Sequence, residues 1–211
     1  MKETGIIMSG NHPKLILDKL KTMTRRTYGL EKVNDMPYLW EKPFYSEEYQ
    51  RWGFWQKNTG DVIYLKCPYG QVGDKLWIRE TFDYIFGDEG DYLIYKADKE
   101  SEDWFKQRKT EGSKITWKPS IFMPRWASRI TLEITGVRVE RVQGISVEDC
   151  ISEGYPFGVI PEGLNQTQIA IARVSRRGWF QTLWDSLNAK RGYGWDFNPW
   201  VWPISFKKEE K

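Results

Sequence analysis

The segment from Arg129 to Val142 constrains the fold of this chain more than any other. Apolar residues alternate with polar ones in both of its halves, but on opposite parities: Ile130, Leu132 and Ile134, then Val137 and Val139. Alternation of this kind predicts a strand with one buried face, and the parity shift predicts a β-bulge at Thr135–Gly136. A long bent strand is typical of a small closed or half-closed barrel, so we expect a compact β-rich core.

The other segments predict a mixture of strands and helices. β-Branched and aromatic content predicts strands at Thr4–Ser9, Asp61–Cys67, Lys75–Glu80, Asp91–Ala97, Ile115–Trp117 and Trp200–Phe206. Caps and apolar periodicity predict helices at Pro13–Leu20, Ser146–Gly154 and within Gln166–Arg191. We interpret Tyr28–Gly60 as an insertion with a short helix near Ser46–Trp52. The 211 residues contain no repeat or linker, which predicts one α+β domain.

Composition excludes several classes of protein. No apolar run is long enough to cross a bilayer, and the first residues lack a secretory signal, so we expect a soluble cytoplasmic protein. Cys67 and Cys150 stand far apart, which predicts two free thiols and no metal site. His12 is the single histidine, which argues against Ser–His–Asp or Cys–His catalysis and against His-ligated zinc. We therefore expect neither a metal nor a cofactor.

Aromatic residues are unusually frequent, with 12 Trp, 11 Tyr and 10 Phe making 16% of the chain. Most of these rings fit a core of large side chains. Some could instead form stacking platforms for nucleobases. The net charge of +3 permits a polyanionic partner without requiring one.

The motif KTMTRR, Lys21–Arg26, is the first candidate for chemistry. We expect it at the end of the first helix, where Lys21 and Thr24 would lie one turn apart. Arg25 and Arg26 would lower the pKa of Lys21, so that its neutral amine could deprotonate the Thr24 hydroxyl and make it a nucleophile. The simpler interpretation is that cations and threonines cap a helix end.

Two arginine-bearing segments are candidates for ligand binding. At the end of the strand Lys75–Glu80, Arg79 could face a ligand that Glu80 orients, or the two could form an ion pair on a rim. In the proline-rich loop Lys118–Ile130, Trp126 could stack on a base while Arg125 and Arg129 hold a phosphate. The alternative is a buried tryptophan between solvated arginines.

Glu153, in the segment SEGY, is the candidate carboxylate. It follows a predicted helix whose last carbonyls repel an anion. A residue placed against local preference is weak evidence for a role elsewhere.

In this order the motifs resemble the ASCH family of the PUA-like superfamily, in particular the larger ASCH proteins of bacteriophages and prophages. The resemblance rests on KTMTRR, CPYGQVGDKLWIRETF, PSIFMPRWASRITLEITGVRVERVQGISVEDCISEGY and LWDSLNAKRGYGWDFNPWVWPISF. It implies a small β-barrel flanked by helices, in the cytoplasm of a bacterial host. It also implies binding of RNA or a modified nucleoside, with Arg25 and Arg26 among the ligand-binding residues.

Some small ASCH proteins are amidohydrolases that deacetylate N4-acetylcytidine, and others are reported as ribonucleases. The lysine and threonine of the amidohydrolases match Lys21 and Thr24, and the glutamate falls on Glu153. Three hypotheses therefore stay open: a binding module for RNA or a nucleobase-type ligand, an amidohydrolase, and a phage accessory protein that acts by protein contact through the aromatic insertion. The sequence indicates no oligomeric state.

Overall fold

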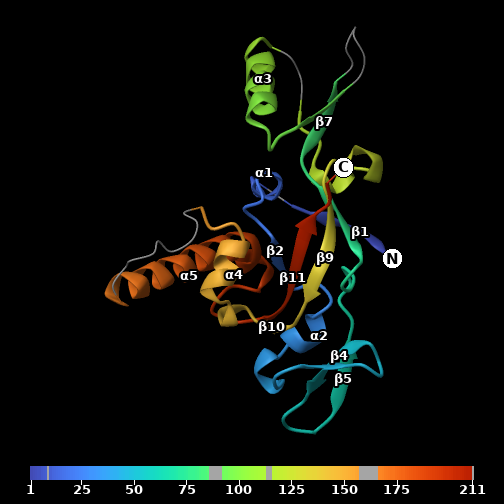
Figure 1. The fold of residues 1–211 in the computed structure, drawn as a ribbon, viewed down its shortest axis with the longest axis vertical. Coiled ribbons are helices and arrows are strands. Elements are labelled where there is room, and N and C mark those ends of the chain that lie inside the picture. The colour runs from blue at the N-terminus through green and yellow to red at the C-terminus, as the bar shows by residue number, and fades with distance from the viewer. Residues whose placement is uncertain (9, 86–91, 113–115, 157–165, 211) are drawn as a thin grey trace.

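A six-stranded sheet forms the centre of the molecule in the computed structural model, which describes residues 1–8, 10–85, 92–112, 116–156 and 166–210. The strands follow the order β1-β6-β9-β11-β10, and β2 also pairs with β11 (Figure 1). β1 and β6 are parallel, and the other pairs are antiparallel. The strands are β1 (Glu3–Ile7), β2 (Met23–Arg26), β6 (Lys75–Arg79), β9 (Thr131–Val137), β10 (Glu140–Arg141) and β11 (Trp200–Lys208).

β9 carries the predicted bulge. Gly136 pairs with Ser205 and Ile134 pairs with Phe206, so Thr135 is an extra residue in the β9–β11 ladder. A bulge bends its strand and increases the local twist. The central sheet accordingly curls into a half-barrel, and the α+β class is confirmed.

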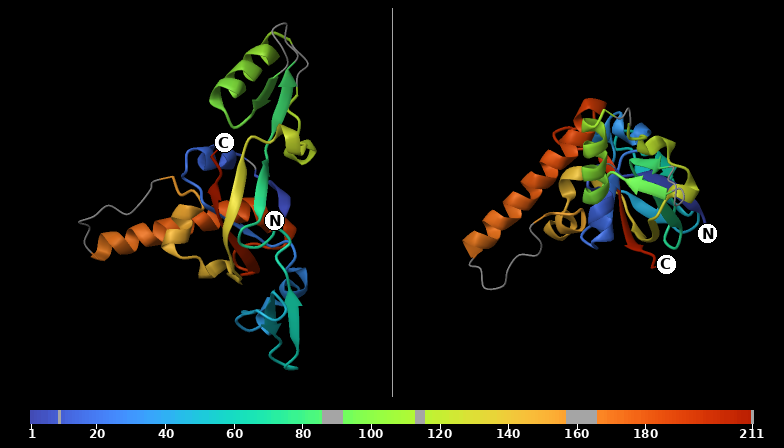
Figure 2. Two further views of the ribbon diagram at one scale, coloured as in Figure 1. Left: turned by 45° about the vertical axis from the view of Figure 1, so that its right-hand side comes forward. Right: turned by 90° about the horizontal axis from the view of Figure 1, so that it is seen from above.

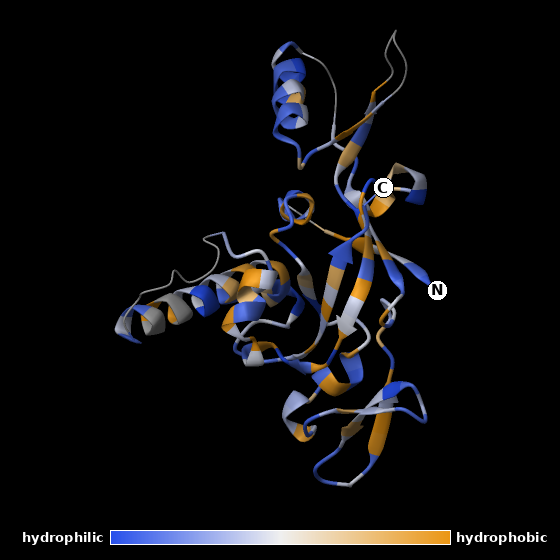
Figure 3. Cartoon of the chain, in the orientation of Figure 1, coloured by the Kyte–Doolittle hydropathy of each residue, from blue (hydrophilic) through white to orange (hydrophobic). Residues whose placement is uncertain are grey.

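Apolar side chains fill the concave side of this sheet and stabilise it. Among the described residues, the largest cluster includes nine that are completely buried: Leu30, Val33, Phe54, Leu76, Ile78, Leu132, Ile134, Trp202 and Ile204. Apolar residues alternate with polar ones along the central strands (Figure 3). Burial of apolar area at about 25 cal/mol per Å² makes this cluster the main source of stability.

The described part of the chain contains five α-helices: α1 (His12–Leu17), α2 (Glu31–Asn34), α3 (Lys99–Thr110), α4 (Val147–Ser152) and α5 (Gln166–Asn188). The Ser146 hydroxyl accepts a hydrogen bond of 3.0 Å from the Asp149 amide, as the predicted N-cap of α4 requires. A second apolar cluster, including Cys150, Phe180, Trp184 and Val201, joins α4 and α5 to β11. The N-terminal part of α5 extends beyond the sheet (Figure 2).

The insertion contributes β3 (Phe44–Ser46) and β4 (Arg51–Trp55) to a three-stranded antiparallel sheet, which β5 (Val62–Leu65) completes from the strand predicted after the insertion. The predicted helix near Ser46–Trp52 is therefore wrong, because that stretch is a turn followed by β4. Cross-strand aromatic contacts favour the sheet, for instance between Tyr45 and Trp52 at 5.5 Å.

A second small lobe consists of the hairpin β7 (Phe82–Ile85) and β8 (Tyr92–Tyr95) together with α3. It lies at the opposite end of the central sheet from β4 and β5 (Figure 1). The strand predicted at Ile115–Trp117 falls partly outside the described residues. Of its described part, Trp117 is not in a strand and stacks on Phe105 at 4.3 Å.

The first helix ends before the motif KTMTRR begins, which is earlier than the sequence predicts. α1 ends at Leu17, and Lys19 has a φ of +59°, which breaks the helix. Met23–Arg26 is strand β2, whose hydrogen bonds to β11 replace those of a helix. Lys21 and Thr24 are therefore not one helical turn apart.

Candidate functional site

Lys21 and Glu153 meet in the interior although 132 residues separate them. The Thr22 amide donates to the Ser152 carbonyl at 2.8 Å, which ties the start of β2 to the end of α4. The Lys21 Nζ atom donates to Glu153 Oε2 at 2.6 Å and to the Glu153 carbonyl at 2.8 Å. The two residues are only 2% and 3% exposed. Lys21 and Glu153 thus lie close together as predicted, but Lys21 precedes a strand and does not end a helix.

Arg25 holds the other oxygen of the same carboxylate. Its Nη1 atom lies 3.1 Å from Glu153 Oε1, and its Nη2 atom lies 2.7 Å from Glu140 Oε1. Asp149 accepts from both Arg25 and Arg138, and Arg138 also donates to Glu140 at 3.0 Å. Three cations therefore face three carboxylates in one network, and their charges balance.

The environment fixes the charge states in this network. Burial opposes ionisation of Glu153, but Lys21 and Arg25 outweigh it and hold the pKa of Glu153 below its usual value. Burial lowers the pKa of Lys21 more than Glu153 raises it, and the charges of Arg26 and Arg25 lower that pKa further. The expected effect of the arginines is therefore present, but burial is the larger cause.

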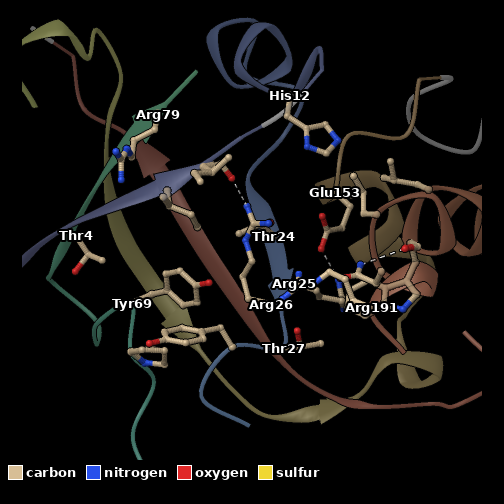
Figure 4. A pocket seen from close by; sticks show the side chains of 18 of the residues that line it. Thr4, His12, Thr24, Arg25, Arg26, Thr27, Tyr69, Arg79, Glu153 and Arg191 are labelled. Carbon is tan, nitrogen blue, oxygen red and sulfur yellow. Dashed lines mark hydrogen bonds and ion pairs between the residues drawn. The ribbon is translucent and has the colours of Figure 1, made fainter. Parts of the chain in front are cut away.

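A cavity of about 490 Å³ opens beside this network. Its walls come from β1, β2 and β6, the turn at Pro68–Tyr69 and the C-terminal part of α5. Thr24, Arg25 and Glu153 line it, whereas Lys21 lies behind Glu153 and is not part of the wall. In Figure 4, Arg79, Thr4 and Tyr69 lie on one side of the cavity, and His12 and Glu153 on the other.

Three arginines of the cavity have no carboxylate partner among the described residues: Arg26, Arg79 and Arg191. Arg26 donates to the Ile7 carbonyl at 2.8 Å, and Arg79 donates to the Ile121 carbonyl. The Nε atoms of Arg26 and Arg79 are buried without hydrogen-bond partners. The one carboxylate in the wall, Glu153, is already neutralised, so the cavity carries uncompensated positive charge.

Aromatic and hydroxyl groups complete the cavity wall. Tyr28 and Tyr69 contact each other edge to face, with ring centroids 6.5 Å apart, and Tyr28 is 60% exposed. The Thr24 hydroxyl has no hydrogen-bond partner within the described part of the chain. The cavity therefore offers a reachable ring, an available hydroxyl and positive charge in one place.

His12 also lines the cavity, opposite Arg79 (Figure 4). Burial lowers the pKa of His12 to about 4, and the nearby charge of Lys21 adds to the shift. The imidazole is therefore neutral at physiological pH and adds no charge to the site.

The remaining predicted site residues lie outside the cavity. Arg129 pairs with Glu80 at 2.9 Å and with Asp98 at 2.6 Å, and its guanidinium lies 3.9 Å from the centre of the Tyr95 ring. These contacts attach the lobe of β7, β8 and α3 to the sheet. The rim ion pair is thus Glu80 with Arg129, not Glu80 with Arg79.

The loop before β9 does not reach the cavity either. Arg125 pairs with Glu3 at 3.0 Å, and Trp126 is 70% exposed and contacts the Tyr84 ring edge to face. The expectation that this loop would share one pocket with Lys21 and Glu153 is therefore wrong. Its proline-fixed turn directs Arg125 and Trp126 to the outer surface instead.

Sequence reasoning missed Tyr28, Tyr69 and Arg191 as wall residues. Tyr28 lies two positions after the last residue of the KTMTRR motif, and this nearness to a candidate site could have indicated it. Arg191 sits at the end of η5 (Ala189–Arg191), and only the packing of α5 against β2 brings it to the cavity.

The described residues show neither a metal site nor a membrane-spanning helix. They contain no group of three or more His, Cys, Asp or Glu side chains placed to hold a metal ion. None of the helices in that part of the chain is both long and apolar enough to span a bilayer.

Comparisons with known proteins add one structural match. No model of a protein family matches the sequence, and no curated protein matches it. Among solved structures, the chain is similar to the crystal structure of an ASCH domain from Lactobacillus crispatus JV V101. That match has 12% identity and a TM-score of 0.36, and covers 98% of this chain and 79% of the other. This is the family that the sequence motifs resemble.

Proposed function

We propose that the protein binds a nucleobase-bearing ligand, either a free nucleotide or an unpaired nucleotide of an RNA, in the cavity beside β2. The observation that carries the proposal is the combination of the exposed Tyr28 ring with guanidinium groups that lack carboxylate partners. A nucleobase offers a flat face for stacking, and a phosphate offers the missing negative charge. Few other common ligands satisfy both demands.

The size of the cavity favours a single nucleotide over a duplex. About 490 Å³ lies within the range of roughly 300–1,000 Å³ that small-molecule sites occupy. Proteins that read RNA by sequence commonly take unpaired bases and stack them on aromatic or arginine side chains. An RNA ligand would therefore enter the cavity with one base turned out.

The outer loop could extend such a site for a longer strand. Trp126 and Phe122 are each 70% exposed, and Arg125 lies next to Trp126 in the sequence. Exposed rings beside a cation suit stacking and phosphate pairing along a single strand. Base stacking by Trp126 therefore stays a prediction, whereas the pairing of Arg129 with two carboxylates argues against a ligand role for Arg129.

The experiment is a thermal-shift panel of nucleosides, nucleoside monophosphates and a short unstructured RNA. We expect at least one nucleotide to raise the Tm in a saturable way, because a ligand that binds only the native state stabilises it. Tyr28→Ala should weaken that binding by about tenfold, or about 1.4 kcal/mol, which lies within the roughly 1–3 kcal/mol of a base stacked on an aromatic ring. Tyr38→Ala is the matched control, since Tyr38 is 65% exposed and lies outside the cavity. No shift with any compound would remove the proposal.

The second candidate function is an amidohydrolase acting on an acylated cytidine. It is favoured by the contact of 2.6 Å between Lys21 and Glu153 and by the available Thr24 hydroxyl in the same wall. In this mechanism Thr24 attacks the acyl carbon, and its proton passes to the Lys21–Glu153 pair, which returns it to the nitrogen of the departing amine. The C–N bond breaks and leaves an acyl-threonine, and water then hydrolyses this ester to the carboxylic acid and restores the Thr24 hydroxyl.

Incubation with N4-acetylcytidine tests this candidate directly. We expect release of acetate and cytidine by the unmodified protein, and loss of turnover in Lys21→Ala and Thr24→Val. Equal turnover in the unmodified protein and Thr24→Val would contradict Thr24 as the nucleophile.

A further inference from the structure

Arg26 and Arg79 converge on one part of the cavity from different strands. Arg26 ends β2 and Arg79 ends β6, and both side chains line the wall beside β1. β1 lies between these side chains, since it pairs with β6 while its Ile7 carbonyl accepts from Arg26. The sheet therefore fixes the position of both guanidinium groups.

Neither guanidinium is neutralised by the protein. Three other arginines near the central sheet, Arg25, Arg129 and Arg138, have carboxylate partners. Arg26 and Arg79 donate only to carbonyl oxygens and to a methionine sulfur, and no ion pair involves them in the described part of the chain. A partly buried cation without a counter-ion is costly, so an anion that entered from solvent would stabilise the arrangement.

The hydrogen bonds of both side chains are also incomplete. Each Nε–H group is shielded from solvent and has no acceptor. An arginine presents its donors as a planar fork, which matches the oxygens of a phosphate in a two-point contact. A small rotation of either side chain toward a bound anion would give its Nε–H an acceptor.

We propose that Arg26 and Arg79 form a phosphate subsite, so that the cavity selects phosphorylated nucleotides, free or as an RNA end, over nucleosides. This inference rests on the proposed function, because it assigns the charged part of the same ligand. Tyr28, whose side chain is 60% exposed, would hold the base, and the phosphate would lie beside β1, where Arg26 contacts the Ile7 carbonyl. The Lys21–Glu153 network would then face the part of the ligand between them.

The test compares each nucleoside with its 5′- and 3′-monophosphate by isothermal titration. We expect the preferred monophosphate to bind at least about tenfold more tightly than its nucleoside, as a hydrogen-bonded charge pair does. Arg26→Gln and Arg79→Gln should each reduce this ratio toward one, while glutamine keeps a donor for the carbonyl that each arginine contacts. Arg51→Gln is the control, because Arg51 is exposed on β4 and lies outside the cavity.

The outcomes separate the subsite from the proposed function. Equal binding of nucleoside and monophosphate, or a ratio of affinities unchanged in both cavity variants, would overturn the subsite and leave nucleobase binding intact.

If no nucleoside or nucleotide binds, titration with inorganic phosphate decides whether the subsite exists. Phosphate binding that is weakened in Arg79→Gln but not in Arg51→Gln supports the subsite. Absence of phosphate binding overturns the subsite. Circular dichroism of each variant shows whether it is folded. If Arg26→Gln does not fold, Arg79→Gln alone provides the test.

Discussion

At the scale of single residues, the molecule separates its charges into a balanced group and an unbalanced one. Lys21, Arg25 and Arg138 are paired with carboxylates inside the protein, so they hold structure together. Arg26 and Arg79 keep their charge available to the cavity. The balanced group positions Glu153 and Thr24 beside the unbalanced one, and a ligand can therefore meet both.

The first prediction concerns the buried Lys21–Glu153 pair. Lys21→Met or Glu153→Gln alone should lower the free energy of unfolding by about 3–5 kcal/mol, because each leaves a buried partner without its counter-charge. The double variant should lose less than the sum of the two. Urea unfolding of the four proteins measures this coupling.

An exposed pair provides the control for that cycle. Lys14 and Asp18 are in contact on α1, but their side chains are 48% and 40% exposed. Lys14→Met and Asp18→Asn should each change the free energy of unfolding by less than about 0.5 kcal/mol. Equal costs for the buried and exposed pairs would contradict the role assigned to burial.

The second prediction concerns pH and His12. Burial lowers the pKa of His12 to about 4 in the folded protein, from a usual value of 6.5. As pH falls below 6.5 the unfolded chain binds a proton that the folded protein does not, so His12 lowers stability between pH 6.5 and pH 4. The loss reaches about 3 kcal/mol at pH 4 and is absent above pH 7.

Comparison with His12→Gln isolates this effect from the titration of carboxylates. The difference in free energy of unfolding between the unmodified protein and His12→Gln should be constant from pH 7 to pH 8 and should fall steadily toward pH 4. A difference that does not change with pH would show that the histidine is not buried as described.

At the scale of elements, the turn after α4 delivers Glu153 to Lys21. Gly154 has a φ of +99°, and a Cβ atom there would lie 2.9 Å from Leu15 Cδ1. Only glycine fits this turn without strain. The third prediction is that Gly154→Ala lowers the free energy of unfolding by about 1–3 kcal/mol.

Gly144→Ala is the matched control for the turn. Gly144 ends η4 (Val142–Gly144), has no positive φ, and a Cβ atom added there would meet nothing within 4 Å. This substitution should be nearly neutral in thermal unfolding. If Gly154→Ala proves as stable as Gly144→Ala, the turn does not need the left-handed backbone.

Local patterns predicted most elements because each depends on nearby residues. The bulge at Thr135 and the cap at Ser146 follow from alternation and cap chemistry, and the strand predicted at Trp200–Phe206 is β11, which continues to Lys208. β2 was not predictable in this way, because its structure depends on pairing with β11, about 180 residues away in the chain. The sheet of β3, β4 and β5 is local in the sequence, since Phe44 pairs with Gly53 and Trp52 pairs with Leu65, and β5 was the one of its strands that the sequence predicted.

At the scale of the whole molecule, the candidate site could be predicted only in part. The meeting of Lys21, Thr24 and Glu153 at one place was expected, and their motifs lie on elements that pack together. The positions of Arg125, Trp126 and Arg129 were not predicted correctly, because the direction of a loop depends on tertiary contacts such as the Arg129–Asp98 pair. The two lobes lie at opposite ends of the central sheet (Figure 1), and their strands and helix contribute no described residue to the cavity wall.

The central claim is that the cavity beside β2 binds a nucleotide, and a crystal structure with the tightest-binding nucleoside monophosphate tests it most directly. We predict a base ring whose centre lies about 4.5–7 Å from the ring of Tyr28 or Tyr69, with the phosphate against Arg26 and Arg79. A ligand bound elsewhere on the protein, with the cavity empty at saturating concentration, would contradict the account.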